Sequence, residues 1–547
     1  MIDRMGSDII GHICMFLKKC DVDTLSLSCK KCYNDSINHK LCNFYLKTNN
    51  ITDIPPFRHI ILGNDFNQFT HGFPLQLSVV NHTNNINHIN HTNHTNHTNH
   101  ITHINHITHL IFSDLFNESI IGMSELLPQL THLTFGKKFN QSLFNQSLKG
   151  ISPTVTHLTL GNYFDKSLIG MSESLPQLTH LTLGDYFNQS LEGMSKSVTH
   201  LNFVLRFNRP LEEMSQLSHI THLTFGAHFN NPLVGMPSSV THLKFNRNFD
   251  QSLIGMSQSV THLTFGSCFN QSLVGISKSV THLTFGHCFN QSLVGMPSFV
   301  THLTFGYCFG KSLEGMSSLQ QLTHLTFGDC FDQPLCEIPT SKITHLTLGV
   351  RFNNSLEGMS VSLPRITHLI FGNWFNQDLD GMSSSVTHLT FGDSFNRSLT
   401  GMSSSVTHLT FGEEFDQSLH GMSSSVTNLK FGDRFSQSLE GISPNVTHIA
   451  FGNQYNESLV GMSMLLPKIT HLEFGFYFDQ PLIGMSPSVT HLTLGDNFNQ
   501  SLKEIPASVT HLTYKNYHLR EIPHTVKYLN GKPYFRMTNS CFKKLKI

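Results

Sequence analysis

A histidine recurs along most of the 547-residue chain within the tetrapeptide T-H-L-T and its close variants. Imidazole binds metals and transfers protons near neutral pH, so this array is the first place to look for chemistry. A zinc site needs ring nitrogens that converge to about 2.0–2.1 Å from the metal, and a straight row cannot surround an ion. General acid–base catalysis needs one histidine that differs from its neighbours, and none does. We therefore expect a polar, solvent-facing ladder made of His109, His132, His157, His180, His200, His222, His242, His262, His282, His302, His324, His345, His368, His388, His408, Asn428, His448, His471, His491 and His511.

Four cysteines also share one phase of the pattern: Cys268, Cys288, Cys308 and Cys330. In other copies the same position holds tyrosine, histidine, arginine, tryptophan or glutamate, and this variety predicts a tolerant, partly exposed site. Cys29 and Cys32 have the spacing of a zinc-ligand pair but lack a second pair. The chain has no glycine-rich phosphate loop, nucleophile elbow or paired carboxylates. We expect no catalytic residue, no metal site and no cofactor.

The spacing of the histidines, mostly 20 to 23 residues over about twenty-one copies, predicts a solenoid. In the segment S-V-T-H-L-T-F-G-S-C-F-N-Q-S-L the side chains alternate as in a short strand. Leu263 and Phe265 then face the core, while His262 and Thr264 face outward. We expect Phe269 and Leu273 to be buried as well. The fold class is a leucine-rich-repeat-like parallel β solenoid with short strands and an irregular convex side.

Two further expectations concern the turns of each copy. Gly266 follows the strand, where we expect the chain to turn tightly. The asparagine or aspartate after each second phenylalanine, such as Asn270, is expected to bond local backbone groups.

The row of histidines also predicts a pH dependence. Imidazoles on adjacent strands would lie about 5 Å apart, and two charges at that distance repel by roughly 1 kcal/mol in water. The folded stack should resist protonation, so we expect a lower melting temperature at about pH 5 than at about pH 7.5.

Composition excludes several classes of protein. Only 13% of the residues are charged and the net charge is −1, so we expect no nucleic-acid partner. No apolar run reaches the ~18 residues of a membrane span, and we expect no membrane contact. Asp3 and His12 interrupt the N-terminal apolar stretch, which makes a poor signal peptide. With eleven cysteines and no leader, we expect an intracellular protein, cytoplasmic or nuclear.

The pattern divides the chain into five segments. Residues 1–45 lack the repeat and show helical spacing of apolar residues; 46–80 form a linker with a degenerate first coil at His59. Residues 81–106 are a His/Asn/Thr tract of low complexity, expected to be a loop, and loose metal binding by it stays open. The solenoid spans 107–514, and 515–547 form a C-terminal cap with a basic tail.

The recurring motif FNQSL, with its variants FDQPL (Phe331–Leu335 and Phe478–Leu482) and FNNPL (Phe229–Leu233), resembles the FNIP repeats. This family is leucine-rich-repeat-like, and the resemblance covers residues from about 107 to 525. FNIP arrays joined to an F-box occur in social amoebae and in giant viruses of amoebae, and the resemblance implies such a source.

The N-terminal stretch DIIGHICMFLKKCDVDTLSLSCKKCYNDSI resembles an F-box. It departs from the family pattern at Met5-Gly6, where the family has Leu-Pro, and at Cys32, where it has Trp. The resemblance implies a three-helix module that binds a Skp-type adaptor and, through it, a cullin. A plain helical cap on the solenoid is the alternative. The implied adaptor-binding residues are Ile9, Ile10, Ile13, Leu17, Val22, Leu25, Cys29 and Lys30.

Together the two resemblances imply a non-enzymatic, substrate-recruiting adaptor of a cullin–RING ubiquitin ligase whose solenoid binds a protein substrate. Two alternatives stay open: a protein-binding scaffold without a ubiquitin role, and a His-rich metal-binding protein. The candidate substrate-binding strip consists of the outward-facing strand residues, such as His262, Thr264, His282, Thr284, His302, Thr304, His388, Thr390, His408 and Thr410.

Overall fold

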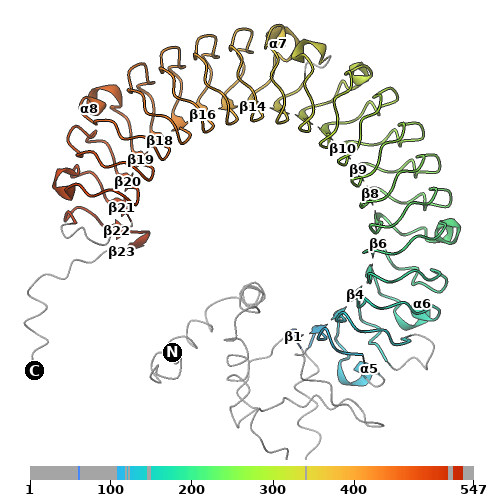
Figure 1. Ribbon diagram of the computed structural model, residues 1–547. Helices are drawn as coiled ribbons and strands as arrows, with labels where there is room; N and C mark the ends of the chain where they lie inside the picture. Colours follow the sequence, from blue (N-terminus) through green and yellow to red (C-terminus); the bar gives the residue numbers. More distant parts are fainter. Residues whose placement is uncertain are drawn as a thin grey trace, which may run out of the picture.

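The computed structural model describes residues 59–61, 107–117, 120, 123–143, 150–338, 342–514 and 522–533. The F-box-like segment 1–45, with all its predicted adaptor-binding residues, and the tract 81–106 lie outside these residues. Within the described part, about twenty short coils stack into an open ring, with the strands on its inner, concave side (Figure 1). The predicted leucine-rich-repeat-like parallel solenoid is confirmed.

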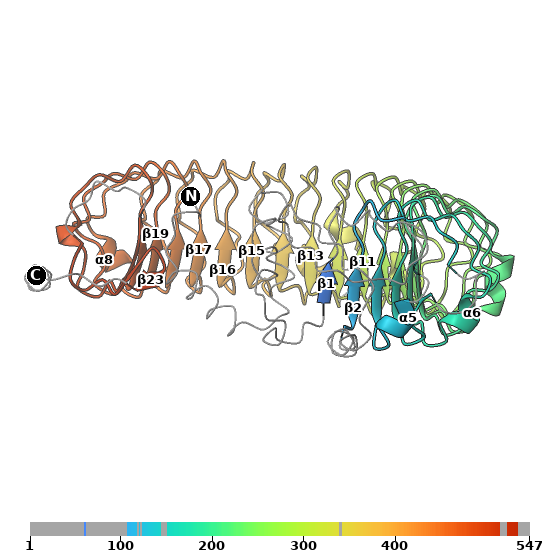
Figure 2. The same cartoon turned by 90° about the horizontal axis from the view of Figure 1, so that it is seen from below.

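Each coil contributes one strand of three or four residues to a single curved sheet, and Figure 2 shows these strands side by side. The strands are β1 His59–Ile61, β2 His109–Ile111, β3 His132–Thr134, β4 His157–Thr159, β5 His180–Leu183, β6 His200–Phe203, β7 His222–Thr224, β8 His242–Lys244, β9 His262–Thr264, β10 His282–Thr284, β11 His302–Thr304, β12 His324–Thr326, β13 His345–Thr347, β14 His368–Ile370, β15 His388–Thr390, β16 His408–Thr410, β17 Asn428–Lys430, β18 His448–Ala450, β19 His471–Glu473, β20 His491–Thr493 and β21 His511–Thr513.

Neighbouring strands pair in parallel and in one constant register. His262 of β9 lies opposite His282 of β10, and the leucines and threonines follow in step. The degenerate copy at His59 is paired with β2 in the same way. At the C-terminal end, β22 (Tyr528–Leu529) pairs in parallel with β21, and β23 (Lys532–Pro533) turns back antiparallel against β22. The constant register places equivalent side chains of successive coils side by side.

The core of each coil is formed by the residues that alternation placed inside. Leu263, Phe265, Phe269 and Leu273 are all buried, as predicted, and Val260 joins them. The ring of Phe265 stacks 3.8 Å from that of Phe269 within the coil and 5.6 Å from that of Phe285 in the next. These aromatic stacks run along the solenoid, so a single coil has little core of its own and depends on its neighbours.

The longer copies have more structure on their convex side. Copies of 20 residues between His222 and His302 cross it without a helix. Copies of 23 residues carry one α-helical turn, placed on the outside of the ring (Figure 1): α5 Met123–Leu126, α6 Met171–Ser174, α7 Met359–Ser362 and α8 Met462–Leu465. Other copies carry 3-10 turns: η3 Glu212–Gln216, η4 Met316–Ser318, η5 Leu335–Glu337 and η6 Leu502–Glu504.

The glycine after each strand has a different role from the tight turn that we expected. The backbone of Gly266 does not lie in the left-handed region, but a Cβ there would collide with the carbonyl oxygen of Asn246 in the preceding coil. Glycine is needed because two backbones approach closely. The left-handed turn is made instead by the later glycine, Gly275, whose φ is +93°.

The asparagine after the second phenylalanine also differs from expectation. The Asn270 side-chain oxygen does not bond a local group; it accepts a hydrogen bond from the backbone N–H of Asn290, 20 residues further on, at 2.8 Å. Asp250 bonds the N–H of Asn270 in the same way. The polar side chain thus ties one coil to the next, and it satisfies a backbone donor that lies outside the sheet.

Candidate functional site: the concave face and the variable edge

The predicted histidine ladder lies on the concave face. From His109 to His408, fifteen imidazole rings stack in one continuous column, with centroids 4.0–4.3 Å apart and planes within about 15° of parallel. The spacing is closer than the 5 Å expected from the strands, because the column follows the inside of the curve. The residues of the candidate strip, His262 and Thr264 with their equivalents, are half-buried here, except for the more exposed His408.

The threonine before each histidine orients the imidazole ring, a role that we did not predict from the sequence. The hydroxyl of Thr261 lies 3.0 Å from Nδ1 of His262 and also donates to the carbonyl oxygen of Thr241 at 3.2 Å. The hydroxyl has one hydrogen. When that hydrogen goes to the carbonyl, the threonine oxygen accepts a hydrogen bond from Nδ1–H of the imidazole. Nε2 is then left as an acceptor on the concave side of the solenoid. The sequence does indicate this role, because a threonine precedes the histidine position in every copy from His109 onward.

Eleven of the ladder histidines resist protonation, for two physical reasons. Burial first, and repulsion from neighbouring imidazoles second, lower the pKa of His157 and of His222 to about 4. Burial alone lowers the pKa of His180. Burial, with a smaller contribution from neighbouring rings, lowers the pKa of His200, His242, His282, His324, His345, His388, His471 and His491.

Parallel stacking also limits the chemistry of the column. The free ring nitrogens point in the same direction, so they do not converge. Across the part of the chain that is described, no three His, Cys, Asp or Glu side chains are grouped so that they could hold a metal ion. The ladder is a surface of regularly spaced hydrogen-bonding edges.

One copy interrupts the column. At Asn428 the ring is missing, and the Thr427 hydroxyl donates to Oδ1 of Asn428 at 2.9 Å. His408 and His448, on either side, are the exposed members among the strand histidines from His109 onward. A hollow of about 360 Å³ lies over this stretch, along β16 to β20. The column resumes at His448 and ends with Tyr528 stacked 4.4 Å from His511.

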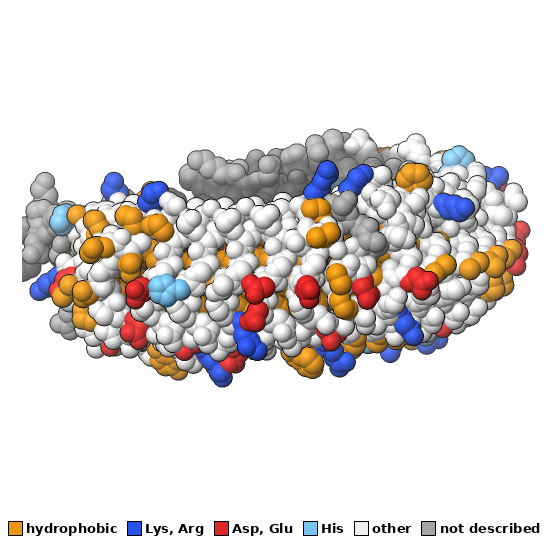
Figure 3. All heavy atoms as spheres, turned by 90° about the horizontal axis from the view of Figure 1, so that it is seen from above, with side chains coloured by type: hydrophobic (Ala, Val, Ile, Leu, Met, Phe, Trp, Pro, Cys, Tyr) orange, Lys and Arg blue, Asp and Glu red, His pale blue; other side chains and the backbone are white. Residues whose placement is uncertain are grey.

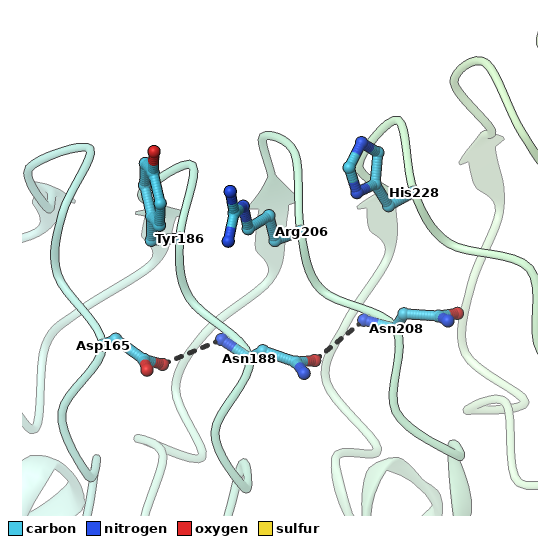
Figure 4. Close-up of a pocket in the computed structure, with 6 residues that line it drawn as sticks. All are labelled: Asp165, Tyr186, Asn188, Arg206, Asn208 and His228. Carbon is cyan, nitrogen blue, oxygen red and sulfur yellow. Dashed lines mark hydrogen bonds between the residues drawn. The ribbon is translucent and has the colours of Figure 1, made fainter.

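A second row of side chains lies at the edge of the ring, in the turns that follow the strands. Its members precede the second phenylalanine of each coil and vary from copy to copy. The ring of Tyr186 stacks 4.9 Å from that of Tyr163, and the guanidinium of Arg206 lies 4.1 Å from the Tyr186 centroid. Figure 4 shows Tyr186, Arg206 and His228 side by side above the Asp165–Asn188–Asn208 hydrogen-bonded chain, around a hollow of about 560 Å³.

The four cysteines of the predicted phase belong to this variable edge. Cys268, Cys288, Cys308 and Cys330 are free thiols and partly exposed, as the variety at their position predicted. Burial raises the pKa of the Cys308 thiol, with a smaller contribution from Cys288 and Cys330. A raised pKa keeps a thiol in its less reactive form.

On the face of the ring shown in Figure 3, acidic and basic side chains are interspersed and hydrophobic ones form small groups. The described residues contain two salt bridges, Lys137–Asp114 and Arg434–Glu414, and both are exposed. In the described segments no helix is long and apolar enough to cross a membrane.

The fold and its two surface rows define a leucine-rich-repeat-like solenoid, an architecture typical of non-enzymatic proteins that bind other proteins. The model of the FNIP repeat matches residues 144–186, 229–268, 269–308, 375–413 and 478–517. The chain belongs to the FNIP-repeat family. No curated protein matches it in sequence.

A solved structure agrees with this fold. CroV588, described as a novel circular leucine-rich-repeat protein structure, is 30% identical, with 80% of this chain and 78% of that chain covered and a TM-score of 0.66. Two weaker matches have lower identity. The functional domain of InlJ from Listeria monocytogenes, which includes a cysteine ladder, is 11% identical over 57% of this chain and 66% of that one, with a TM-score of 0.34. The TLR13–ssRNA13 complex matches 77% of this chain and 73% of that one at 13% identity, with a TM-score of 0.40.

Proposed function

We propose that this protein recruits protein substrates to a cullin–RING ubiquitin ligase. In this proposal the F-box-like segment 1–45 binds a Skp-type adaptor, and the ring holds the substrate. Ubiquitin transfer is then a matter of proximity, because the substrate is kept near a charged ubiquitin-conjugating enzyme that other subunits supply. The chain itself contributes binding and no chemistry.

The observation that carries the substrate-binding half is the contrast between a repeated frame and a variable edge. Leucine, phenylalanine and histidine recur coil after coil, whereas the edge position changes from Tyr186 to Arg206, Cys268, Trp374 and Glu414. Tyrosine, tryptophan and arginine are the residues enriched in protein interfaces. Trp374 and Tyr163 are 55% and 47% exposed, so both side chains are accessible to a binding partner.

The concave strip supplies the second contact surface of the proposal. Its imidazole rings, including that of His262, follow one another at 4.0–4.3 Å along the inside of the solenoid, and strand threonines such as Thr264 add further hydrogen-bonding groups. Neutral imidazoles fit this role, and burial lowers the pKa of His282 and of His388 in the strip, which favours their neutral form.

Adaptor binding is tested with the full chain and a recombinant Skp-type adaptor. The double substitution Ile13→Asp, Leu17→Asp should abolish co-purification, because it places charges on the apolar face that the F-box resemblance assigns to the adaptor. Asn38→Asp, outside the matched positions, is the control and should bind like the unaltered chain. No binding by the unaltered chain, or equal binding by the double variant, would leave only the protein-binding scaffold.

Substrate binding is tested separately at the edge. The double substitution Tyr186→Ala, Arg206→Ala removes the stacked pair seen in Figure 4 and should weaken substrate capture without changing the melting temperature. Lys278→Ala, an exposed residue away from the edge row, serves as the control. Equal capture by both variants would contradict the assignment of the edge.

A further inference from the structure

The interruption of the histidine column at Asn428 is a local structure with features of its own. The stacking distances on its two sides are 4.2 Å for His388–His408 and 4.1 Å for His448–His471. If the same spacing continues across Asn428, two steps of the column separate the His408 and His448 rings by about 8 Å. We call the space between these two rings, above Asn428, the ladder gap.

Asn428 fills only the inner part of that space. Its Oδ1 accepts from the Thr427 hydroxyl, so the carboxamide takes the place of the inner atoms of an imidazole and lacks the outer Cε1 and Nε2. The outer halves of the His408 and His448 rings are consequently uncovered, and both residues are exposed, whereas the other strand histidines from His109 onward are half-buried. Stacked carbon atoms prefer separations of about 3.5–4.0 Å, so the ladder gap admits one planar ring.

The strand residues beside the ladder gap also depart from the repeat. The third strand position is threonine in most copies, but it is Lys430, Ala450 and Glu473 in β17, β18 and β19. Lys430 and Glu473 are exposed, and neither belongs to a salt bridge of the described residues. Ala450 between them removes side-chain bulk. All of these residues line the 360 Å³ hollow, together with Asn428, His408 and His448.

From this arrangement we infer that the ladder gap is a receptor for one aromatic side chain on an extended segment of a partner protein. The inference rests on the proposed protein-binding function and specifies its concave contact. The ring of the partner would complete the imidazole column between His408 and His448, with the Asn428 amide as a donor at its edge. Lys430, in the same strand as Asn428, would bind a carbonyl oxygen of the partner backbone, and Glu473, two strands further along, would bind an N–H group of it.

A polypeptide fits this hollow better than a nucleic acid does. The floor carries one positive and one negative side chain, so it has no net attraction for a phosphate backbone. Lys430 and Glu473 place opposite charges two strands apart on the floor of a shallow groove, and these match the donors and acceptors of an extended peptide. Aromatic side chains lose little conformational entropy on binding, which suits an open site of this kind.

The test uses Asn428→His, which restores the ring present in the other copies and should leave the stability unchanged or raised. The probe is N-acetyl-L-tryptophanamide, followed by NMR of the histidine ring carbons in the full chain, with N-acetyl-L-leucinamide as the non-aromatic control. We expect saturable shifts at His408 and His448 with the aromatic probe, lost in Asn428→His. No shifts, equal shifts in the variant, or equal shifts with the leucine probe would overturn the inference.

A matched control distinguishes binding that is specific to the ladder gap from binding at any position that lacks an imidazole. His282→Asn creates a second gap, flanked by threonines instead of Lys430, Ala450 and Glu473. For a partner that binds the unaltered chain, Asn428→His should weaken binding about tenfold, as loss of a central aromatic contact does, and His282→Asn should not. Equal binding by Asn428→His would overturn the receptor and leave the scaffold proposal standing. If the chain self-associates and Asn428→His abolishes that association, the bound partner is a second copy of the chain and the inference of a different partner protein is overturned.

Discussion

The imidazole of His262 lies 4.3 Å from that of His282, centroid to centroid, with the two planes 11° apart. This contact repeats around the ring, so the protonation of one histidine affects two neighbours. Stacked neutral rings attract one another weakly, whereas charged ones at this distance repel. The concave face is thus a coupled array, and its response to pH belongs to the whole column.

We predict that the solenoid loses stability in mild acid. In the folded protein the pKa of His157 and of His222 is about 4, against an ordinary value of 6.5, and other ladder histidines shift in the same direction. Between these values the unfolded chain binds more protons, so stability is full above about pH 6.5 and falls as the pH drops toward about 4. Thermal unfolding followed by circular dichroism should give a lower melting temperature at about pH 5 than at about pH 7.5.

The control for this prediction interrupts the column at two internal positions. The double substitution His222→Asn, His282→Asn should reduce the dependence of the melting temperature on pH, since asparagine keeps the threonine bond as Asn428 does. An equal or higher melting temperature at the acid pH would contradict the prediction.

A second prediction concerns the two kinds of glycine. Gly266→Ala should destabilise the solenoid by more than about 3 kcal/mol, because the new Cβ collides with backbone atoms of the preceding coil. At Gly295, φ is +93° but, apart from the adjoining residues of the chain, no atom lies within 4 Å of the place that a Cβ would occupy, so Gly295→Ala should cost only about 1–2 kcal/mol of left-handed strain. Urea unfolding of both variants measures the difference. Similar losses for the two would show that the close approach is not the cause.

The asparagine column gives a third prediction. Asn270→Ala removes the acceptor of the Asn290 N–H and should cost about 1 kcal/mol, the typical net value of one hydrogen bond. Asn270→Asp keeps an oxygen in place, as Asp250 does one coil earlier, and should be close to neutral. Urea unfolding checks the order of the two variants. A loss as large for aspartate as for alanine would contradict the proposed role of the side-chain oxygen.

What the sequence could predict depends on whether a contact is local. Alternation within a strand places Leu263 inside and His262 outside without knowledge of the next coil. The roles of Gly266 and Asn270 lie in contacts with residues about 20 positions earlier or later, and local spacing carries no information on those. The role of Thr261 was within reach of the sequence, because its hydroxyl bonds the adjacent His262. The break at Asn428 was visible in the sequence as a substitution. The gap that this substitution leaves could not be predicted, because it depends on the stacking of the neighbouring imidazole rings, which only the three-dimensional register shows.

The last prediction tests how far one coil depends on its neighbours. Phe269 is fully buried and stacks on Phe249 and Phe289 of the adjacent coils at 6.0 Å. Phe269→Ala should cost about 3–5 kcal/mol, as deletion of a buried aromatic ring does. Val274→Ala, at a side chain that is 65% exposed, is the control and should stay within about 0.5 kcal/mol of the unaltered chain. Because coils contact only their neighbours, amide hydrogen exchange should accelerate most in β8, β9 and β10 and remain slow in β14 and β15. Uniform acceleration around the ring would show that the solenoid unfolds as one unit, and that its coils are not energetically local.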